Sequence, residues 1–438
     1  MKTLQVPFCF YPDAVGGTEI YVEALARGLR ELKEEVVIAA PASSERSYLH
    51  EGLPVERFAV SGTASLEELY GEGDPLAAES FARILEKHKP DLVHLHAFTR
   101  GVSLRLARQV RRRGIPIVFT YHTPTVSCQR GTLIRWGKEV CDGILRAGAC
   151  TRCTLQGLSI PRPAADLIGS IPVRAGEALG AAGLSGGVWT ALRMRQLIRL
   201  RHRAFRSLMD ETEWVVAPCQ WVRDLLIRNG IPKEKVIFCR QGIPLPFPLR
   251  DLPSRPKRSE IRAVFLGRLD PPKGARVILR ALRASPELPM TLDMCHPAPG
   301  IAEEPYLSEL RRLASGDPRI RFQEPIPRGD VVRRLADYDL LVVPSQLLET
   351  GPLVVLEAFG AGLPVLGSRL GGIAELVRDG VDGLLVKPDS IEEWTRSLGR
   401  VCSQPDLLGR LRLGILPPRT MDDVSRETQS LYRQALGE

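Results

Sequence analysis

Short apolar runs alternate along the chain with longer stretches whose apolar residues recur at helical spacing. Leu4–Phe10 and Val36–Ala40 are continuous enough in apolar residues to form buried strands. Between them, Glu19–Leu32 carries an apolar stripe of helical period, and the Thr18 hydroxyl can cap its first turn. A strand, a glycine-rich loop, a helix and a second strand in this order predict a βαβ unit.

The alternation continues to about residue 243 and is interrupted once. Residues 123–175 break it with clustered cysteines and prolines, so we interpret them as an insertion into the first domain. This half contains further predicted strands at Asp91–Leu95, Pro116–Tyr121, Trp214–Ala217 and Val236–Cys239, and predicted helices at Val102–Arg112, Trp189–Met209 and Trp221–Asn229.

A second series of strands and helices follows a proline-rich stretch, 244–256, that is typical of a linker. Its predicted strands include Ile261–Gly267, Thr291–Met294, Arg319–Phe322, Leu340–Val343 and Pro364–Gly367. We therefore expect an α/β protein of two Rossmann-like domains, 1–243 and 244–418, whose parallel sheets face each other across a cleft. A last helix, within 419–438, is expected to cross back to the first domain.

Composition supports two globular domains. The chain has 438 residues, of which 44% are hydrophobic and 25% charged, and no apolar run reaches the roughly 18–20 residues that span a bilayer. The first residues lack the long apolar core of a signal peptide, so we expect a cytoplasmic protein. The formal net charge of +9 favours an anionic partner, for which nucleotide phosphates, anionic lipid and nucleic acid are candidates.

Candidate chemistry is concentrated after two strands of the second half. After one strand, a loop carries Glu349, and Pro352 suits the first turn of a helix that contains Glu357. Backbone amides at the start of such a helix bind phosphate well. The amides expected to do so belong to Gly351, Leu353 and Val354. The apolar residues around Glu357 favour a buried or cleft position over an ordinary exposed one.

Two basic residues follow the other strand. Arg268 comes directly after Ile261–Gly267, and Lys273 opens the next helix. An arginine fork beside a mobile lysine charge suits a diphosphate. Basic residues at loop tips are also commonly just solvated, so this pair gains weight only together with the carboxylates.

These segments resemble the donor half of the retaining GT-B glycosyltransferases of the glycogen-synthase-like family 4. That family carries a Gly-Arg-x4-Lys-Gly segment and a Glu-x7-Glu motif, which stand here as Gly267–Gly274 and Glu349–Glu357. Gly16–Glu19 and His122 match two further motifs of the family, and Gly367–Gly383 resembles a late loop of its second domain.

The resemblance implies transfer of a sugar from a nucleoside-diphosphate sugar to a hydroxyl of a carbohydrate or lipid-linked acceptor, in glycan, polysaccharide or glycolipid synthesis. Arg268 and Lys273 would neutralise the diphosphate and stabilise it as leaving group. Glu349, with the amides after it, would hold the donor sugar and its phosphates, and Glu357 would hydrogen-bond the ribose hydroxyls. The family implies retention at the anomeric carbon and no catalytic metal.

In the first domain the resemblance implies that Gly16 and Gly17 let the backbone approach the phosphates. It also implies that His122 contacts the transferred sugar near its anomeric carbon. His94 and His96 end the preceding strand. A His-x-His pair can bind a metal, but we favour a packing or polar-network role, with His96 lining the acceptor side.

Three segments depart from the family pattern, namely Gln241–Gly242, Glu324 and Cys295–Gly300. They lie near the expected nucleobase side, so the identity of the base is left open.

The clustered cysteines of the insertion are its least ordinary feature. A Cys-x2-Cys pair and two further thiolates can complete a tetrahedral zinc site, which we favour over free thiols, disulfides or an iron–sulfur cluster. Such a zinc would be structural and would supply folding energy to an insertion with little apolar core of its own. The cysteines are Cys128, Cys141, Cys150 and Cys153.

The helix at Trp189–Met209 is the most basic one. A core-packed helix with a solvated basic face is favoured over contact with an anionic membrane, which would lie at the inner face. Its arginines are Arg193, Arg195, Arg199, Arg201, Arg203 and Arg206. Two other functions compete, a nucleic-acid-binding protein with a zinc module and a GT-B-like sugar-nucleotide epimerase. No nucleic-acid module is recognisable and the paired donor motifs favour transfer, so we expect no nucleic-acid partner.

Overall fold

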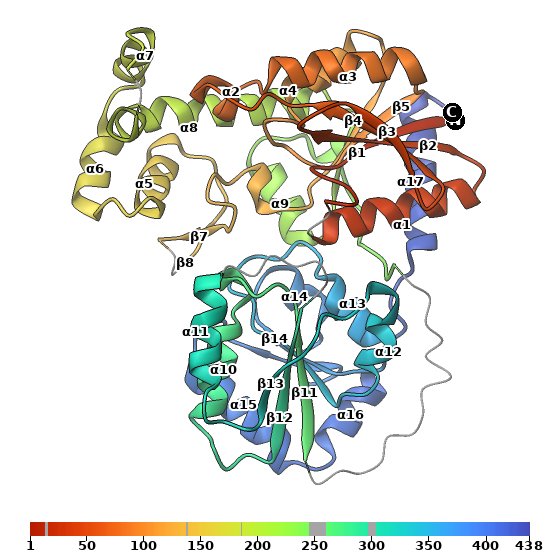
Figure 1. Cartoon of the computed structure of the whole chain (residues 1–438), viewed down its shortest axis with the longest axis vertical. Coiled ribbons are helices and arrows are strands. Elements are labelled where there is room, and N and C mark those ends of the chain that lie inside the picture. Colours follow the sequence, from red (N-terminus) through yellow and green to blue (C-terminus); the bar gives the residue numbers. More distant parts are fainter. Residues whose placement is uncertain (14–15, 137–138, 185, 245–259, 297–303) are drawn as a thin grey trace. The chain divides into compact units, whose positions relative to one another are not determined.

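The computed structural model describes the whole chain except residues 14–15, 137–138, 185, 245–259 and 297–303 (Figure 1). Two compact units divide the chain. Unit 1 comprises Met1–Arg240 with Ser425–Glu438, and unit 2 comprises Gln241–Val424. Most of the proline-rich linker and of the Cys295–Gly300 segment lies outside the described residues. Among the helices that are described, none is both long and apolar enough to span a membrane.

Unit 1 is built on an eight-stranded sheet in the order β10-β9-β6-β5-β1-β2-β4-β3. The strands are β1 Lys2–Val6, β2 Glu35–Ala42, β3 Arg46–His50, β4 Leu53–Ala59, β5 Leu92–Leu95, β6 Ile117–Thr120, β9 Trp214–Ala217 and β10 Val236–Phe238. All of these pair in parallel except β3, which runs antiparallel to β4. The strand order reverses between β1 and β5, so their carboxyl ends flank a topological switch point, where α/β sheets bind ligands.

Helices of unit 1 pack their apolar faces on this sheet. In α1 the buried face includes Val22, Leu25 and Leu29, spaced three and four residues apart as a one-sided helix requires. The helices that accompany the sheet are α1 Gly17–Glu31, α2 Leu66–Tyr70, α3 Pro75–His88, α4 Leu104–Arg111, α8 Gly187–Asp210, α9 Gln220–Arg228 and α17 Met421–Leu436. From Ser425 on, α17 belongs to unit 1, where Tyr432 is fully buried.

The insertion forms a small helical subdomain that projects from the rest of unit 1 (Figure 1). Its helices α5 and α7 pack on α8, and Leu155, Ala165, Met194 and Ile198 form a core between these elements. Leu155 and Ala165 come from α5 and α6 of the insertion, whereas Met194 and Ile198 come from α8, so the insertion shares this core with α8. Its elements are η1 Pro124–Val126, β7 Ile134–Arg135, β8 Glu139–Val140, α5 Ala147–Gly157, α6 Arg162–Ser170 and α7 Val173–Ala181.

Unit 2 contains a six-stranded parallel sheet in the order β13-β12-β11-β14-β15-β16. The strands are β11 Ile261–Leu266, β12 Met290–Cys295, β13 Ile320–Phe322, β14 Leu340–Val343, β15 Val365–Ser368 and β16 Gly383–Val386. Here the order reverses between β11 and β14. Their carboxyl ends carry the Arg268 loop and the Glu349 loop, so both predicted motifs lie at the switch point of this sheet.

Helices cover both faces of the unit 2 sheet (Figure 1). Successive strand residues enter different cores, because Ala263 and Phe265 pack with α10, α11 and α15, whereas Val264 packs with α12 and α13. This two-sided burial explains why the strands are continuously apolar in sequence. The helices are α10 Ala275–Arg283, α11 Glu304–Ala314, α12 Val331–Leu335, α13 Leu353–Gly360, α14 Gly371–Leu376, α15 Ile391–Ser403 and α16 Leu407–Gly414.

The two predicted Rossmann-like domains with parallel sheets are confirmed, with local corrections. The first strand was expected to reach Phe10, but β1 ends at Val6. Phe10 is fully buried within the loop that follows, so its apolar character reflects packing and not strand structure. The helix after the Glu349 loop begins at Leu353, with Pro352 as its N-cap residue.

Candidate functional site

In unit 2 the loop after β11 places two basic side chains at the switch point. Asp270 organises both of them. Its Oδ1 accepts a hydrogen bond from the backbone N–H of Lys273 at 3.2 Å, and its Oδ2 lies 2.9 Å from Arg268 Nη2. Sequence analysis did not single out Asp270, although an aspartate before two prolines is a recognisable cap of the short helix η4 Pro271–Lys273.

The loop after β11 packs directly on the end of β14. Gly274 has φ +75°, and a Cβ atom there would lie 1.8 Å from the carbonyl oxygen of Pro344. The backbone N–H of Gln346 donates to the carbonyl of Pro272 at 2.7 Å. Glycine is therefore required at position 274 by both backbone conformation and space. The Lys-Gly pair of the motif thus holds the two loops together as well as presenting the lysine.

Lys273 and Glu349 form an ion pair across these two loops. Lys273 Nζ lies 2.7 Å from Glu349 Oε1, and the Ser345 hydroxyl donates to the same oxygen at 2.7 Å. Burial raises the pKa of Glu349, but the charge and hydrogen bond of Lys273, the Ser345 hydroxyl and the charge of Arg268 outweigh burial and lower it overall. Glu349 is thus a carboxylate that only accepts hydrogen bonds. Ser345 was missed from the sequence, where a serine after a strand is too common to stand out.

The glycine-rich stretch after β15 supports the Glu349 loop from the other side. The backbone N–H of Gly372 donates to the carbonyl of Glu349 at 2.6 Å. Gly371 has φ +51°, and a Cβ atom there would lie 2.9 Å from the Cα of Leu348. This contact gives the late motif of the sequence a structural role, since it fixes the loop that leads into α13.

The start of α13 presents the amides predicted to bind phosphate. Leu353 and Val354 are its first two residues, and Gly351 lies just before the Pro352 cap. The first amides of a helix have no carbonyl partner within the helix, so they can donate to an anion. All three residues belong to the segment that Glu349 begins, next to the Lys273 ion pair.

Glu357 lies in the same helix and is half-buried. Burial raises the pKa of its carboxyl to about 7, and the charge of Arg328 opposes that rise. In the part of the chain that the structure describes, no hydrogen bond or ion pair satisfies this carboxyl. A half-buried acid without a hydrogen-bond partner lowers the free energy of unfolding, and such groups often mark ligand sites.

In unit 1 the predicted residues also lie at a switch point. Gly16 follows β1 as the N-cap residue of α1, and its N–H donates to Glu19 Oε2 at 3.1 Å. Its backbone is extended, and a Cβ atom there would meet nothing closer than 3.6 Å. The fold of unit 1 therefore does not by itself demand glycine at position 16. Gly17 is the first residue of α1.

His122 follows β6 and is 5% exposed. Burial lowers its pKa to about 3, so the imidazole is neutral. Its Nε2 lies 3.0 Å from His96 Nδ1, and the Tyr21 ring approaches it edge-on with centroids 4.8 Å apart. His94 and His96 are 1% exposed and belong to a hydrogen-bonded network, as the favoured sequence interpretation expected.

The structure does not show the zinc site predicted for the insertion. Across the described residues, no three His, Cys, Asp or Glu side chains are placed to hold one metal ion. Burial, and then the neighbouring Cys128, Cys141 and Cys153, raise the pKa of Cys150 to about 11. None of these four cysteines forms a disulfide, and Cys150 packs against the apolar core that the insertion shares with α8.

The basic helix α8 is less solvated than predicted. Arg193 and Arg201 are 5% and 8% exposed. Arg201 donates to the carbonyls of Phe98 and Thr125, at 3.0 Å each, and burial lowers its pKa to about 10. Two of the six arginines are thus structural. Arg199, Arg203 and Arg206 are exposed.

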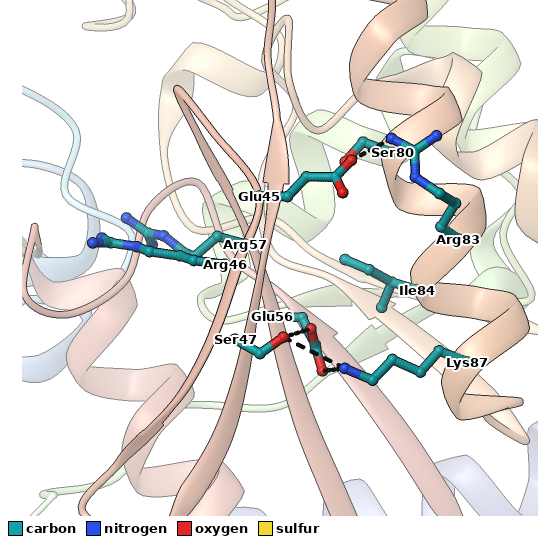
Figure 2. A pocket seen from close by; sticks show the side chains of 9 residues that line it. All are labelled: Glu45, Arg46, Ser47, Glu56, Arg57, Ser80, Arg83, Ile84 and Lys87. Atoms are coloured by element: carbon teal, nitrogen blue, oxygen red, sulfur yellow. Dashed lines mark hydrogen bonds and ion pairs between the residues drawn. The ribbon is translucent and has the colours of Figure 1, made fainter.

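A pocket of about 320 Å³ lies between β3, β4 and α3 of unit 1 (Figure 2). Its acidic side chains are already paired. Glu56 accepts from Lys87 at 2.7 Å and from Ser47 at 2.5 Å, and Glu45 pairs with Arg83. No predicted site residue lines this pocket, whose lining carries two acidic and four basic side chains.

The fold and the geometry of unit 2 point to one class of protein. Two parallel-sheet units with cationic loops and a helix start at a switch point are the architecture of GT-B glycosyltransferases. Among solved structures, a sucrose-phosphate synthase from Thermosynechococcus elongatus matches with a TM-score of 0.68 and 18% identity, covering 100% of both chains. Anabaena Alr3699/HepE in complex with UDP and glucose matches with a TM-score of 0.63 and 18% identity, covering 99% of this chain and 100% of that chain. Both likenesses concern the fold.

Sequence comparison then fixes the family. Residues 16–242 match the glycosyl transferase 4-like domain, and residues 260–404 match the glycosyl transferases group 1. The chain belongs to this family of glycosyltransferases. D-inositol 3-phosphate glycosyltransferase from Thermobispora bispora is 27% identical over 425 residues, which cover 91% of this chain and 84% of the relative. The predicted class of enzyme is confirmed, and neither nucleic-acid binding nor epimerisation finds support.

Proposed function

We propose that the chain transfers a sugar from a nucleoside-diphosphate sugar to a hydroxyl acceptor with retention at the anomeric carbon. The bond between the anomeric carbon and the β-phosphate oxygen breaks, and a bond from the acceptor oxygen to that carbon forms. The acceptor proton passes to the departing phosphate oxygen. The observation that carries this proposal is the convergence of Lys273, Arg268 and the α13 amides at one switch point.

Each side chain of the unit 2 site then has a task. Arg268 is 44% exposed and Asp270 holds its guanidinium at Nη2, so the guanidinium is oriented yet accessible to a phosphate. The Lys273 ammonium has three donors and gives one of them to Glu349. Its remaining donors can reach phosphate oxygens. Because these groups are ordered before the ligand arrives, they stabilise the charge that develops on the leaving diphosphate.

Glu357 fits the ribose of the nucleotide. Ribose hydroxyls are donors, and an otherwise unsatisfied carboxyl is the acceptor they need. Donation to the ionised form lowers the pKa of Glu357 from about 7, so nucleotide binding favours its carboxylate. In unit 1, His122 would accept a hydrogen bond from a hydroxyl of the transferred sugar, and Gly16 and Gly17 would leave room for the nucleotide sugar.

The nature of the donor and acceptor follows the relatives. We propose a uridine-type donor, supported by the UDP bound to the structurally similar Anabaena protein. A polyol or polyol phosphate is the proposed acceptor class, supported by the name of the Thermobispora relative. The net charge of +9 suits such anionic substrates.

Thermal-shift binding with UDP-glucose, ADP-glucose, GDP-mannose and dTDP-glucose tests the donor proposal. A ligand at 100 times its dissociation constant should add about 2.7 kcal/mol to the free energy of unfolding. Lys273→Ala should lose the shift, whereas Glu392→Gln, on the exposed face of α15, should keep it. Absence of a shift with every nucleotide sugar in the wild-type protein would overturn the proposal.

Transfer itself is tested with the donor that binds. Product NMR with myo-inositol and inositol phosphates reads the anomeric configuration directly. We expect the donor configuration to be kept. An inverted product would contradict retention without contradicting transfer, and donor hydrolysis alone would contradict the acceptor class.

A further inference from the structure

A chain of buried polar side chains links His122 to the C-terminal helix. His122 Nε2 lies 3.0 Å from His96 Nδ1, and His96 Nε2 lies 2.9 Å from Gln5 Oε1. The Gln5 amide nitrogen then donates to the Tyr432 hydroxyl at 3.1 Å. These residues come from three strand ends and from α17, and Gln5 and Tyr432 are fully buried.

The remaining partners close the network. The Gln5 amide nitrogen also donates to the Thr3 hydroxyl at 3.1 Å. The Tyr432 hydroxyl lies 2.6 Å from His94 Nδ1, and His94 Nε2 lies 2.7 Å from the Thr120 hydroxyl. With Tyr432 donating to His94 Nδ1 and His94 Nε2 donating to Thr120, every amide and imidazole contact in this chain pairs a donor with an acceptor, which is the condition for a stable buried network.

The direction of the chain follows from Gln5. Its amide oxygen can only accept, so His96 Nε2 carries a proton. Burial, and then the neighbouring histidines, lower the pKa of His96 well below its ordinary value, so its imidazole is neutral and Nδ1 is bare. A bare Nδ1 accepts, so the proton between the two rings belongs to Nε2 of His122.

We propose that Gln5, His96 and Tyr432 are positioning residues that hold His122 in its Nε2–H tautomer, which makes its Nδ1 a hydrogen-bond acceptor. An acceptor of this kind selects a hydroxyl as its partner, because a hydroxyl donates and an ether or fluorine at the same place does not. The tautomer assignment stands on the geometry of unit 1 alone. Only its consequence for the sugar rests on the proposed function.

Tyr432 connects the network of the strand ends to the C-terminal helix. Its hydroxyl satisfies both Gln5 and His94, so α17 completes a polar core that begins at the first strand of the chain. Without that hydroxyl, the Gln5 amide loses one of its two acceptors and can rotate. A rotated amide would place nitrogen opposite His96 and reverse the proton order as far as His122.

Nitrogen NMR of the histidine rings tests the assignment on the free, full-length protein. The chain has seven histidines, so selective ¹⁵N-histidine labelling gives a tractable spectrum. His122→Asn identifies the relevant signals by their loss. We expect one protonated and one bare nitrogen in His122, with the proton on Nε2. A proton on Nδ1 in the wild-type protein overturns the proposal.

Three variants test the roles of the positioning residues. Gln5→Leu removes the acceptor, and the two His122 nitrogens should shift towards a tautomer average. Gln5→Glu keeps an oxygen opposite His96 and should restore the wild-type tautomer. Tyr432→Phe should move the signals in the direction of Gln5→Leu by a smaller amount. Tyr338→Phe deletes another buried hydroxyl, 2.8 Å from Asp293 in unit 2, and should leave them unmoved.

Kinetics with UDP-glucose then separate positioning from folding. Gln5→Leu should lower kcat/KM by about five- to tenfold, the size expected for losing one neutral hydrogen bond, with most of the change in KM. Gln5→Glu should recover most of it. Unchanged His122 tautomers in Gln5→Leu overturn the inference even if transfer is normal. Intact tautomers in a protein that transfers no sugar would instead overturn the proposed function.

Discussion

Replacing Glu357 by glutamine should make the ligand-free protein more stable and the donor complex weaker. The pKa of this carboxyl rises from an ordinary 4.5 to about 7 because it is buried without a partner. A raised acid pKa contributes stability that is full below pH 4.5 and is lost as pH rises through 7. The shift corresponds to at most about 3 kcal/mol, and partial exposure of the side chain reduces it. We expect Glu357→Gln to gain about 1–3 kcal/mol at pH 8 and less than about 1 kcal/mol at pH 5.

Urea denaturation of both proteins at the two pH values measures this difference. Hydrogen exchange of the β14 and β15 amides reports unit 2 separately, which matters because the chain has two units that can unfold independently. Glu392→Gln serves as the matched control, since Glu392 is exposed and pairs only with Arg396 one helical turn away.

The same substitution should weaken donor binding. Loss of a charged acceptor for ribose hydroxyls should weaken UDP binding by about ten- to a hundredfold. A variant that is no more stable at pH 8 than at pH 5, relative to wild type, would refute the argument that Glu357 is strained by burial. Unchanged UDP affinity would refute its assignment to the ribose.

Lys273→Ala should lower turnover by about 10²–10³-fold with the fold intact by circular dichroism, because it removes a preorganised charge from the leaving diphosphate; wild-type-like turnover would contradict its role. Gly274→Ala should destabilise unit 2 by at least about 1 kcal/mol, since its left-handed backbone and the Pro344 carbonyl exclude a Cβ atom; an unaltered melting temperature would contradict this. If the exposed arginines bind anionic lipid, the wild-type protein should sediment with phosphatidylglycerol vesicles, and the double variant Arg199→Glu, Arg203→Glu should stay in the supernatant. Elemental analysis of the purified protein tests the zinc predicted for the insertion: about one zinc ion per chain would support it, and almost none, with nine titratable thiols in the unfolded chain, would contradict it.

Much of the fold could be predicted because buried parallel strands are continuously apolar and their helices are one-sided. β9 and β14 match their predicted bounds, and most other predicted elements differ from the structure by one or two residues. The hairpin of β3 and β4 escaped prediction because β3 lies at the sheet edge, where its residues alternate in exposure. The helices of the insertion were not predicted, because its clustered cysteines suggested a metal site and the apolar spacing of α5 and α6 was overlooked.

The candidate site was predictable where a motif is local and unpredictable where contacts are distant. Lys273 and Glu349 were identified from flanking strand ends, and the structure brings them into contact. Ser345 carries no sequence signal strong enough to separate it from ordinary loop residues, whereas the Asp270 cap before two prolines was recognisable but was not singled out. Tyr432 and Gln5 meet only through the fold, so no spacing rule could connect them.

The order in which the chain is made matters for unit 1, because its last helix is synthesised after all of unit 2. Domains usually fold in turn as they leave the ribosome. Here the first 240 residues leave the ribosome before Tyr432 has been synthesised. The Gln5 amide and the His94 imidazole therefore still lack the Tyr432 hydroxyl as a hydrogen-bond partner. Until α17 forms, the sheet of the first domain lacks the hydroxyl that satisfies Gln5 and His94. A released chain that ends at Val424 should therefore be digested by protease in unit 1 while unit 2 resists.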